Sequence, residues 1–343
     1  MKFLVLALLM GQAQAASEWV KKLTLPKGFK IEKIIEAKGA RQMTMSPDGT
    51  MYVGTMQEGL VYSISKDGKV TEIFKNLNLP QGVLWENGEL YIAEINSVSK
   101  TKDLKKLTKI KDFRGNRWHG WKTIAKGPDG KLYVPLGAPC NVCDEKLPFM
   151  SIHRMDFDGK NFELVARGIR NTVGYTWHPE TKKLWLTEMG ADQMGEDTPP
   201  DELNVIDQTG EHFGFPYLHG SKLKDKKFAA PKELKIKLPA LEIQAHSSPI
   251  GIAFFPKDKY PKEFYNCFLL AEHGSWNRSK KVGYQVMKGC IKDNKVVSYE
   301  PFITGFKEGE KVHGRPVHFL FNADGSFYLS DDEPGTILKI VYK

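Results

Sequence analysis

The chain has 343 residues, enough for one large all-β domain or two ordinary domains. Its globular composition, with 41% hydrophobic and 11% aromatic residues, excludes a largely disordered chain. The formal net charge of +9 has two interpretations: a solvated basic surface, or attraction of an anionic cofactor or acidic partner. No basic block with interleaved aromatic residues indicates binding to nucleic acid.

The N-terminus has the pattern of a secretory signal. Met1-Lys2 is followed by an apolar run over residues 3–10 and then by QAQAA at residues 12–16. A charged start, a short apolar core and an A-x-A end predict cleavage after Ala15. The apolar run is too short to span a bilayer. We therefore expect a signal peptide over residues 1–15 and an exported mature protein, periplasmic or secreted, without stable membrane insertion.

Strand–turn–strand units recur along the rest of the chain. Tight turns stand at residues 46–49 (SPDG), 127–130 (GPDG), 178–180 (HPE) and 322–325 (NADG), each before a short run rich in apolar residues. Weaker copies begin at Trp85 and Phe255. Pro and Gly supply the turn dihedrals, and alternating apolar residues mark half-buried strands. About six such units of four short strands predict a β-propeller.

The two ends of this array complement each other. A lone strand is predicted over residues 29–35, and the chain ends in a strand over residues 336–342 that leaves its sheet one strand short. Pairing these strands would leave no open edge in the ring. We therefore predict one all-β domain over residues 16–343, a six-bladed β-propeller whose N-terminal strand completes the last blade. Longer segments at residues 96–117, 139–148, 192–200 and 220–245 interrupt the units.

Arginine and histidine residues recur where the predicted units enter or leave their inner strands. Because inner strands line the axis of a propeller, we expect these side chains to converge in one funnel. Cations gathered there without compensating carboxylates predict a polyanionic ligand, since a buried Arg is costly to desolvate unless an anion meets it. The residues are His119, Arg170 with Asn171 beside it, His273, Arg278, His313 and Arg315.

His119 has two interpretations. It stands in the sequence RWHGW, so its ring could pack between Trp118 and Trp121 in a structural corner. Alternatively, it is a neutral imidazole at the propeller axis that acts as a general base.

Two places offer oxygen ligands for a hard cation such as Ca²⁺. The segment from Glu188 to Asp192 ends a strand of the central unit, and its backbone carbonyls could bind a cation together with an anionic ligand. Asp201-Glu202 and the carbonyl of Phe213 offer a second site. Neither place has the spacing of an EF-hand loop.

The four cysteines form two pairs in the sequence, Cys140 with Cys143 and Cys267 with Cys290. In an exported protein an even number favours disulfides. Asp144 follows the C-x-x-C motif where a c-type haem site needs His, and a zinc site would need two further ligands of matching geometry. We predict one disulfide within each pair.

Together these motifs resemble the soluble dehydrogenases that use pyrroloquinoline quinone (PQQ), in particular the glucose/sorbosone dehydrogenase group. The resemblance covers nearly the whole mature chain. It rests on Trp118-His119 before TIAKGPDGKLYVPLGAPCNVC, on GIRN and WHPETKKLWLTEMGAD, on PPDELN and FGFPY, and on AEHGSWNRS and HGRPV. It implies a six-bladed propeller that holds PQQ, a tricarboxylic quinone, on Ca²⁺ near the axis.

The resemblance also implies roles for individual residues. His119 matches the base that takes the sugar hydroxyl proton as hydride passes to the quinone. Arg170 and Asn171 match cofactor contacts, with Arg170 close to the reacting carbonyl, and Arg315 matches a contact to a cofactor carboxylate. The carbonyls of Gly190 and Ala191 match ligands of the cofactor Ca²⁺, whereas Glu202 and the Phe213 carbonyl resemble a structural Ca²⁺ site.

Some residues depart from the glucose-oxidising members of this group. A Lys of those enzymes is replaced by either His273 or Arg278, and the sequence does not decide between them. His313 stands where they have a second Arg. The motif from Cys140 to Cys143 and the short loops resemble the sorbosone branch, which implies a different substrate pocket.

The resemblance predicts an exported quinoprotein that oxidises a sugar, either an aldose or a sorbosone-like aldehyde or alcohol, by hydride transfer to PQQ. The electron acceptor is left open, with a cytochrome or a quinone as candidates. One alternative is a metal-dependent lactonase on the same propeller, which needs carboxylates and Asn at the axis. Another is a non-catalytic extracellular binding module.

Overall fold

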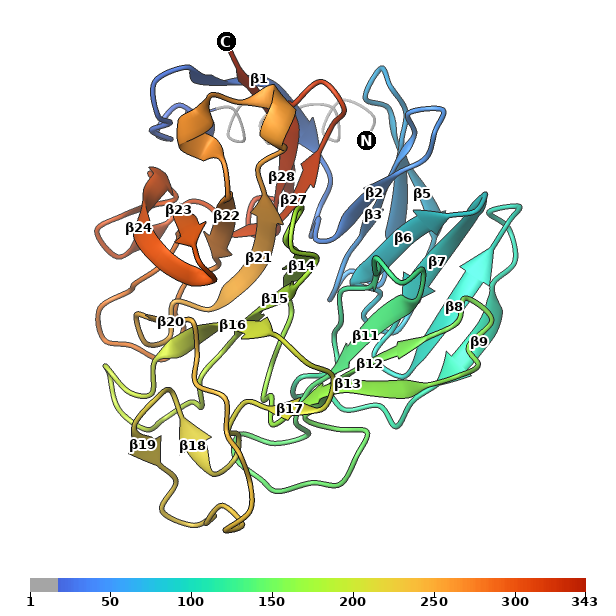
Figure 1. The fold of residues 1–343 in the computed structure, drawn as a ribbon. Coiled ribbons are helices and arrows are strands. Elements are labelled where there is room, and N and C mark those ends of the chain that lie inside the picture. Colours follow the sequence, from blue (N-terminus) through green and yellow to red (C-terminus); the bar gives the residue numbers. More distant parts are fainter. Residues whose placement is uncertain (1–17) are drawn as a thin grey trace.

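The computed structural model describes residues 18–343, and these form a ring of six β-sheets (Figure 1). The predicted signal peptide and its cleavage site lie outside the described residues. The first strands of neighbouring sheets contact one another around the axis, as β2 does with β6 and β27, and β21 with β14 and β27. This arrangement confirms the predicted all-β, six-bladed propeller.

Each blade is an antiparallel sheet, and its strands are given from the axis outward. The first has β2 (Met43–Met45), β3 (Met51–Gly54), β4 (Val61–Ile64) and β5 (Val70–Phe74). The second has β6 (Gly82–Glu86), β7 (Glu89–Ala93), β8 (Ser97–Thr101) and β9 (Thr108–Asp112). The third has β10 (Ala125–Lys126), β11 (Leu132–Leu136), β12 (Ser151–Met155) and β13 (Glu163–Arg167). The fourth has β14 (Tyr175–Trp177), β15 (Leu184–Glu188), β16 (Asp201–Ile206) and β20 (Leu241–Ile243). The fifth has β21 (Pro249–Phe254), β22 (Cys267–Glu272), β23 (Gln285–Lys292) and β24 (Lys295–Ile303).

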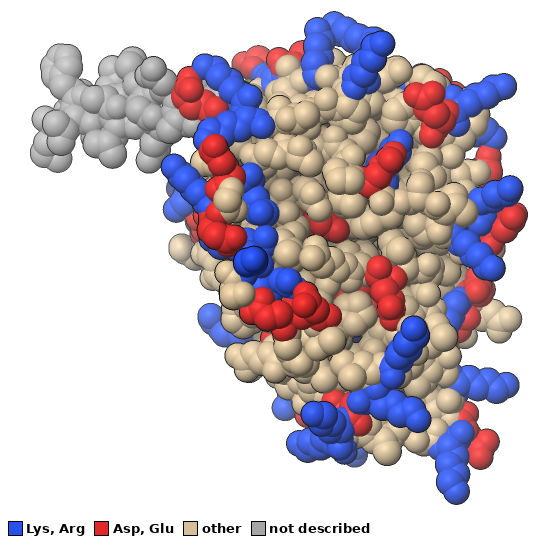
Figure 2. All heavy atoms as spheres, turned by 90° about the vertical axis from the view of Figure 1, so that its left-hand side faces the viewer, with Lys and Arg blue, Asp and Glu red and all other residues tan. Residues whose placement is uncertain are grey.

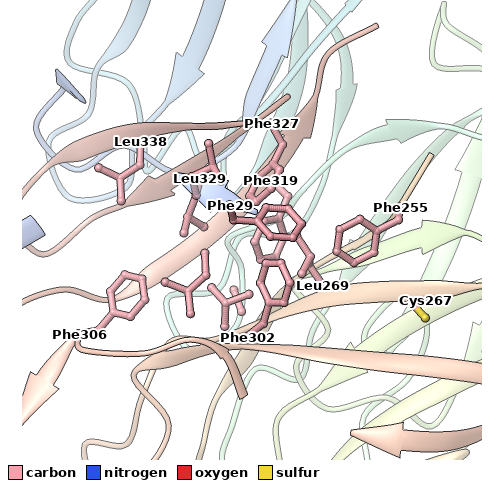
Figure 3. Close-up of a cluster of buried hydrophobic side chains, with 14 of the residues drawn as sticks. Phe29, Phe255, Cys267, Leu269, Phe302, Phe306, Phe319, Phe327, Leu329 and Leu338 are labelled. Carbon is pink, nitrogen blue, oxygen red and sulfur yellow. The ribbon is translucent and has the colours of Figure 1, made fainter. Parts of the chain in front are cut away.

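The sixth blade joins the two ends of the chain. It contains β27 (Pro316–Phe321), β28 (Phe327–Asp331), β29 (Thr336–Tyr342) and, outermost, β1 (Phe29–Glu36). β1 pairs antiparallel with β29 from Phe29–Tyr342 to Glu36–Thr336, which confirms the predicted closure. Figure 3 shows Phe29 among the buried side chains of this region, which include Phe255, Phe302 and Leu338.

Minor elements decorate the ring. β17 (Glu211–His212) extends the third sheet in parallel with β13, and two small hairpins are formed by β18 (Leu218–His219) with β19 (Leu223–Lys224) and by β25 (Lys307–Glu308) with β26 (Lys311–Val312). The 3₁₀ helices η1 (Lys257–Lys259) and η2 (Lys262–Phe264) link β21 to β22. The segment 96–117, expected to interrupt the repeats, instead supplies β8 and β9 of the second blade.

Small and polar residues allow the blades to approach closely at the axis. A Cβ atom on Gly174 would lie 2.1 Å from the carbonyl oxygen of Ile250, and one on Gly251 equally close to that of Val317. Gln42 links three blades, because its Oε1 accepts hydrogen bonds from the amides of Val83 and Ile124. The blades therefore pack against one another around the axis where Gly174, Gly251 and Gln42 lie.

Both predicted disulfides are present, Cys140–Cys143 between β11 and β12 and Cys267–Cys290 across β22 and β23. Figure 2 shows one face of the molecule, on which basic side chains are interspersed with acidic ones. Ion pairs such as Lys288–Glu300 and Lys339–Glu32 are of this kind. On this face the structure favours the solvated-surface interpretation of the net charge. Within residues 18–343, no helix has the length and apolar character needed to cross a membrane.

Candidate functional site

A cavity of about 320 Å³ lies among the segments that enter and leave the inner strands. Of the predicted site residues, it is lined by His119, Arg170, Asn171, Gly190, His273 and Arg315. These residues come from four different blades or the segments before them, so the expected convergence is real. Asp201, predicted with Glu202 as an oxygen ligand, also lines it. Other lining residues, whose side chains the sequence did not single out as ligands, include Arg41, Asp192, Trp276 and Asn277.

Two predicted cofactor contacts do not reach this cavity. The guanidinium of Arg278 turns to the segment 192–200, where it donates to Asp197 at 2.9 Å and to the carbonyl of Glu196. The ring of His313 faces Glu308, with Nε2 3.6 Å from the carboxylate. Between the two residues left open at the lysine position, the structure therefore brings His273 to the cavity and not Arg278.

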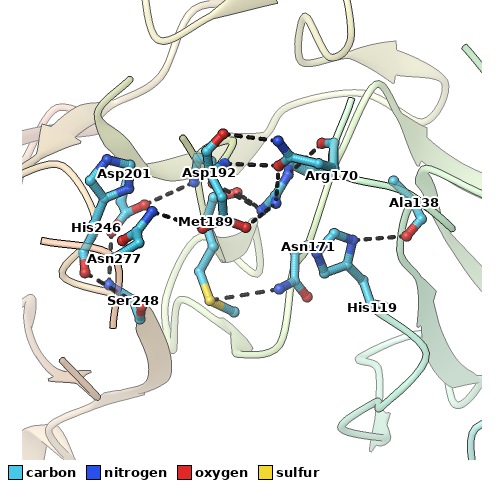
Figure 4. A network of polar contacts seen from close by, with 12 residues as sticks. His119, Ala138, Arg170, Asn171, Met189, Asp192, Asp201, His246, Ser248 and Asn277 are labelled. Atoms are coloured by element: carbon cyan, nitrogen blue, oxygen red, sulfur yellow. Dashed lines mark hydrogen bonds and ion pairs between the residues drawn. The ribbon is translucent and has the colours of Figure 1, made fainter. Parts of the chain in front are cut away.

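His119 is held so that one defined ring nitrogen is left for the cavity. Its Nδ1 lies 2.8 Å from the carbonyl oxygen of Ala138, so Nδ1 carries the hydrogen and Nε2 the lone pair (Figure 4). Burial and the charge of Arg170 lower the pKa of His119 to about 3. The indoles of Trp118 and Trp121 flank the ring. His119 is thus both packed against tryptophans and exposed to the cavity, as a neutral imidazole.

Arg170 is buried, and its guanidinium is fully occupied by neighbours from the protein. Its Nε and one Nη2 hydrogen go to the backbone carbonyl and the side-chain oxygen of Asn141, both at 2.8 Å. The other Nη2 hydrogen forms an ion pair with Asp192 at 2.7 Å (Figure 4). Nη1 donates to the carbonyls of Met189 and Gly190. Every N–H of this side chain therefore has an acceptor.

The expectation of cations without compensating carboxylates is wrong. Asp192 neutralises Arg170, and Asp332 pairs with Arg41 while accepting a hydrogen bond from Nε2 of His273 at 2.8 Å. These carboxylates lie far from their partners in sequence, where no spacing rule links them. The cavity wall is therefore a mixed polar surface with a smaller surplus of positive charge than predicted.

Arg41 is the main residue that the sequence analysis missed. It is 4% exposed and stands two residues before β2, much as Arg315 stands directly before β27. Applying the same positional rule to the first blade would have found it. One of its Nη atoms is paired with Asp332, whereas its buried Nε has no hydrogen-bond partner among the described residues.

Two amide oxygens on cavity-lining residues are also buried without a hydrogen-bond partner within residues 18–343. They are Oδ1 of Asn171, whose Nδ2 makes only a long contact to Met189 Sδ, and Oδ1 of Asn277, whose Nδ2 donates to Asp192. Buried polar atoms are normally satisfied. Together with Nε of Arg41, they leave one unmet donor and two unmet acceptors on residues that line the cavity, which suits a polar ligand that carries both kinds of group.

All four predicted metal ligands lie at one small cavity. Gly190, Ala191, Glu202 and Phe213 line this cavity of about 20 Å³, and Gly190 also lines the central cavity. Successive side chains of a strand point to opposite faces, so Asp201 faces the central cavity while Glu202 faces the small one. Burial raises the pKa of Glu202 to about 7. Among residues 18–343, no group of three or more His, Cys, Asp or Glu side chains is arranged to hold a metal ion.

Two tryptophans project at the rim of the central cavity. Trp118 is 55% exposed and Trp276 is 66% exposed, although both also line the cavity. An exposed indole offers a large apolar face at low cost in conformational entropy, and its N–H can still bind a polar partner. The rim can therefore contact a ligand that is partly apolar and partly polar.

Comparison with known proteins places this architecture in a family. The family model described as Glucose / Sorbosone dehydrogenase matches residues 87–339. An uncharacterized protein of Borreliella burgdorferi is 33% identical over 354 residues, which cover 96% of this chain and 93% of that protein.

Solved structures share the fold at lower identity. A structure of Trichoderma reesei Carbohydrate-Active Enzymes Family AA12 has a TM-score of 0.79 at 17% identity and covers 94% of this chain and 98% of its own. The PQQ-bound form of aldose sugar dehydrogenase from Streptomyces coelicolor has a TM-score of 0.68 at 18% identity, covering 93% and 100%. The extent of the family match, over most of the propeller, shows that this chain belongs to the glucose/sorbosone dehydrogenase family.

Proposed function

We propose that the protein is a sugar oxidoreductase that holds PQQ with Ca²⁺ in the central cavity and oxidises an aldose or a related aldehyde or alcohol. Membership of the glucose/sorbosone dehydrogenase family supports the sugar oxidoreductase. The titles of structural neighbours name a PQQ-bound aldose sugar dehydrogenase and a PQQ domain of a pyranose dehydrogenase, and these support the cofactor. The observation that carries the proposal is His119, a neutral imidazole with Nε2 free at the cavity.

The unmet polar atoms of the cavity fit this cofactor. Nε of Arg41 is a buried donor suited to a carboxylate oxygen, and Arg315 lines the same cavity with its guanidinium only partly used, by the carbonyls of His273 and Gly274. Oδ1 of Asn171 is an acceptor suited to a cation or an N–H group. We therefore assign Arg41, Arg315 and Asn171 to cofactor binding.

Calcium would depend on carbonyl oxygens and on the cofactor itself. The Gly190 carbonyl already accepts from Arg170 at 2.8 Å, so only its second lone pair is left for a cation. When bound, PQQ would supply a quinone that accepts hydride, and Ca²⁺ would polarise the reacting carbonyl. At the smaller cavity, Glu202 and the carbonyl of Phe213 are proposed as a structural Ca²⁺ site.

The protein's own residues account for the proton. Nε2 of His119 is the free base that takes the hydroxyl proton of the sugar, because Nδ1 is committed to the carbonyl of Ala138. That carbonyl also stabilises the imidazolium that forms, whereas the charge of Arg170 disfavours it. Because the pKa of His119 is low, the imidazolium gives up this proton readily. The flanking indoles of Trp118 and Trp121 limit access of water to the ring.

Export and electron transfer complete the proposal. The signal pattern at residues 1–15 supports a periplasmic or secreted protein. The substrate is a small-molecule sugar, and the electrons would pass to a separate acceptor, for which a cytochrome and a quinone are the candidates. The composition supports no role for nucleic acid.

A metal-dependent lactonase is retained as a second candidate because of the carboxylates and amides in the cavity. Asp192, Asp201, Asn171 and Asn277 all line it. The sequence had indicated an axis rich in Arg and His without compensating carboxylates, so these residues make a metal-dependent hydrolase more compatible with the site than expected. Hydrolysis of sugar lactones without quinone would support this candidate.

The decisive experiment is an absorbance titration of the protein with PQQ and Ca²⁺, followed by dye-linked oxidation of a broad sugar panel. We expect a red-shifted quinone band and oxidation of at least one aldose. His119→Gln should lower turnover by roughly 10²–10⁴ while leaving the quinone band intact. A protein that does not bind PQQ in the presence of Ca²⁺ would contradict the proposal. A His119→Gln variant with full turnover would contradict it as well.

A further inference from the structure

Asn141 lies inside the smallest disulfide ring of the protein. Cys140 and Cys143 are bonded to each other, and the ring they close stands in the segment between β11, which ends at Leu136, and β12, which begins at Ser151. A covalent ring of this size removes most of the backbone freedom of the residues inside it. The position of Asn141 is therefore set by the disulfide as well as by its hydrogen bonds.

Asn141 joins two elements of the next blade. Its backbone carbonyl and its Oδ1 accept two of the five N–H groups of Arg170, each at 2.8 Å. The same Oδ1 accepts from the backbone amide of Asp192 at 2.8 Å, and Nδ2 donates to the carbonyl of Asp192 at 2.8 Å. One side chain thus holds both the guanidinium of Arg170 and the start of the segment 192–200.

This clamp determines which way Arg170 points. With two donors on Asn141, the remaining three reach the carbonyls of Met189 and Gly190 and the carboxylate of Asp192. Asp192 can serve as a partner because Asn141 fixes its backbone. Removal of the Asn141 side chain would therefore loosen both the cation and its counterion at the cavity wall.

We propose that Asn141, held in place by the Cys140–Cys143 disulfide, is a positioning residue that fixes the guanidinium of Arg170 beside His119. The proposal concerns the protein's own residues and is independent of which ligand the cavity takes. The effect on His119 is electrostatic: Arg170 and His119 line the same cavity, burial and the charge of Arg170 lower the pKa of the imidazole, and Trp118 and Trp121 pack around the ring.

The test compares Asn141→Ala, the double variant Cys140→Ser/Cys143→Ser and the combined triple variant by NMR titration of the His119 ring, without added ligand. Because Arg170 lowers the pKa of His119, a displaced guanidinium lets the ring protonate at higher pH. We expect an upward shift on the order of one unit in Asn141→Ala and in the double variant. In the triple variant the shift should equal the larger single effect, because the disulfide acts through Asn141.

Asn322→Ala is the matched control, since this Asn lies in an outer turn of the sixth blade and bonds only within that turn. It should leave the His119 titration unchanged. The melting temperature of each variant shows whether it folds, and Asn141→Ser, which keeps a shorter oxygen, replaces Asn141→Ala if that protein does not. If the pKa of His119 is unaltered in folded Asn141 variants, the proposal is overturned. If it is unaltered in the double cysteine variant, the disulfide has no part in positioning Asn141. Because no cofactor is used, neither result bears on the proposed PQQ activity.

Discussion

Nδ1 of His119 lies 2.8 Å from the carbonyl oxygen of Ala138, and this contact decides which ring nitrogen faces the cavity. A carbonyl can only accept, so the hydrogen is on Nδ1 and Nε2 is the base. Burial and Arg170 then keep the ring neutral, with a pKa lowered to about 3. A general base must be unprotonated to act, so His119 is ready to accept a proton over the whole neutral and mildly acidic range.

The first prediction is that activity does not fall between pH 7 and 5, where protonation of a catalytic histidine of ordinary pKa would lower it. The neutral form of His119 is active and its pKa is about 3, so we expect kcat/KM to stay level as the pH falls from 7 to 5. Replacing Arg170 by Met removes a charge that lowers this pKa, so any acidic limb should move to higher pH. The measurement is kcat/KM against pH for both proteins, with circular dichroism confirming folding. A wild-type limb centred near 6.5 would contradict the assignment.

The propeller could be predicted because its signals are local. Tight turns and alternating apolar residues mark each hairpin, and counting strands at the two ends requires β1 to pair with β29. The segment 96–117 was misjudged for the same reason. β9 carries no buried residue, and Lys and Asp dominate it, so the apolar alternation that identifies a strand is missing there.

The site was predicted only as far as position within a repeat determines it. His119, Arg170 and Arg315 each stand in the segment before the first strand of a blade, and they meet at the cavity. Arg278 does not line the cavity, because it lies six residues beyond β22 in a segment that turns toward Asp197. The pairing of Arg41 with Asp332 joins the first and last blades, and only ring closure brings these residues together.

The second prediction tests Arg41 as an anion-binding residue. Its buried Nε has no partner among the described residues, and a hydrogen bond from a charged donor contributes about 1.5–3 kcal/mol. Arg41→Gln should therefore raise the Kd for PQQ by roughly 10- to 100-fold. Quenching of tryptophan fluorescence can measure it, since Trp118 and Trp276 line the cavity. Arg278→Gln removes an arginine that lies outside the cavity and should bind PQQ like wild type; equal affinity in both variants would reject the role of Arg41.

The third prediction concerns ring closure. Phe29 of β1 is 8% exposed, and its ring lies 4.9 Å from that of Phe302 and 4.8 Å from that of Tyr342, measured between centroids. Phe29→Ala should lower the free energy of unfolding by about 3–5 kcal/mol, because it leaves a cavity where the two chain ends meet. Urea unfolding measures it, with the exposed Val297→Ala as control. A loss below about 1 kcal/mol, within the range of ordinary surface substitutions, would show that closure does not depend on this contact.

The fourth prediction assigns substrate contact to the rim. The indole of Trp276 is 66% exposed at the cavity mouth, and the next residue, Asn277, carries a buried amide oxygen without a partner. An apolar face beside a free acceptor suits a sugar, whose ring has C–H faces and hydroxyl edges. Stacking contacts of this kind contribute about 0.5–1.5 kcal/mol, so Trp276→Ala should raise KM up to roughly ten-fold. Because Trp276 is not one of the indoles that flank His119, kcat should change little, as expected when binding is lost equally from ground and transition states. Leu238→Ala, a truncation of another exposed apolar residue outside the cavity, should alter neither constant. A Trp276→Ala variant with unchanged KM, or with kcat reduced as much as kcat/KM, would place the sugar elsewhere in the cavity.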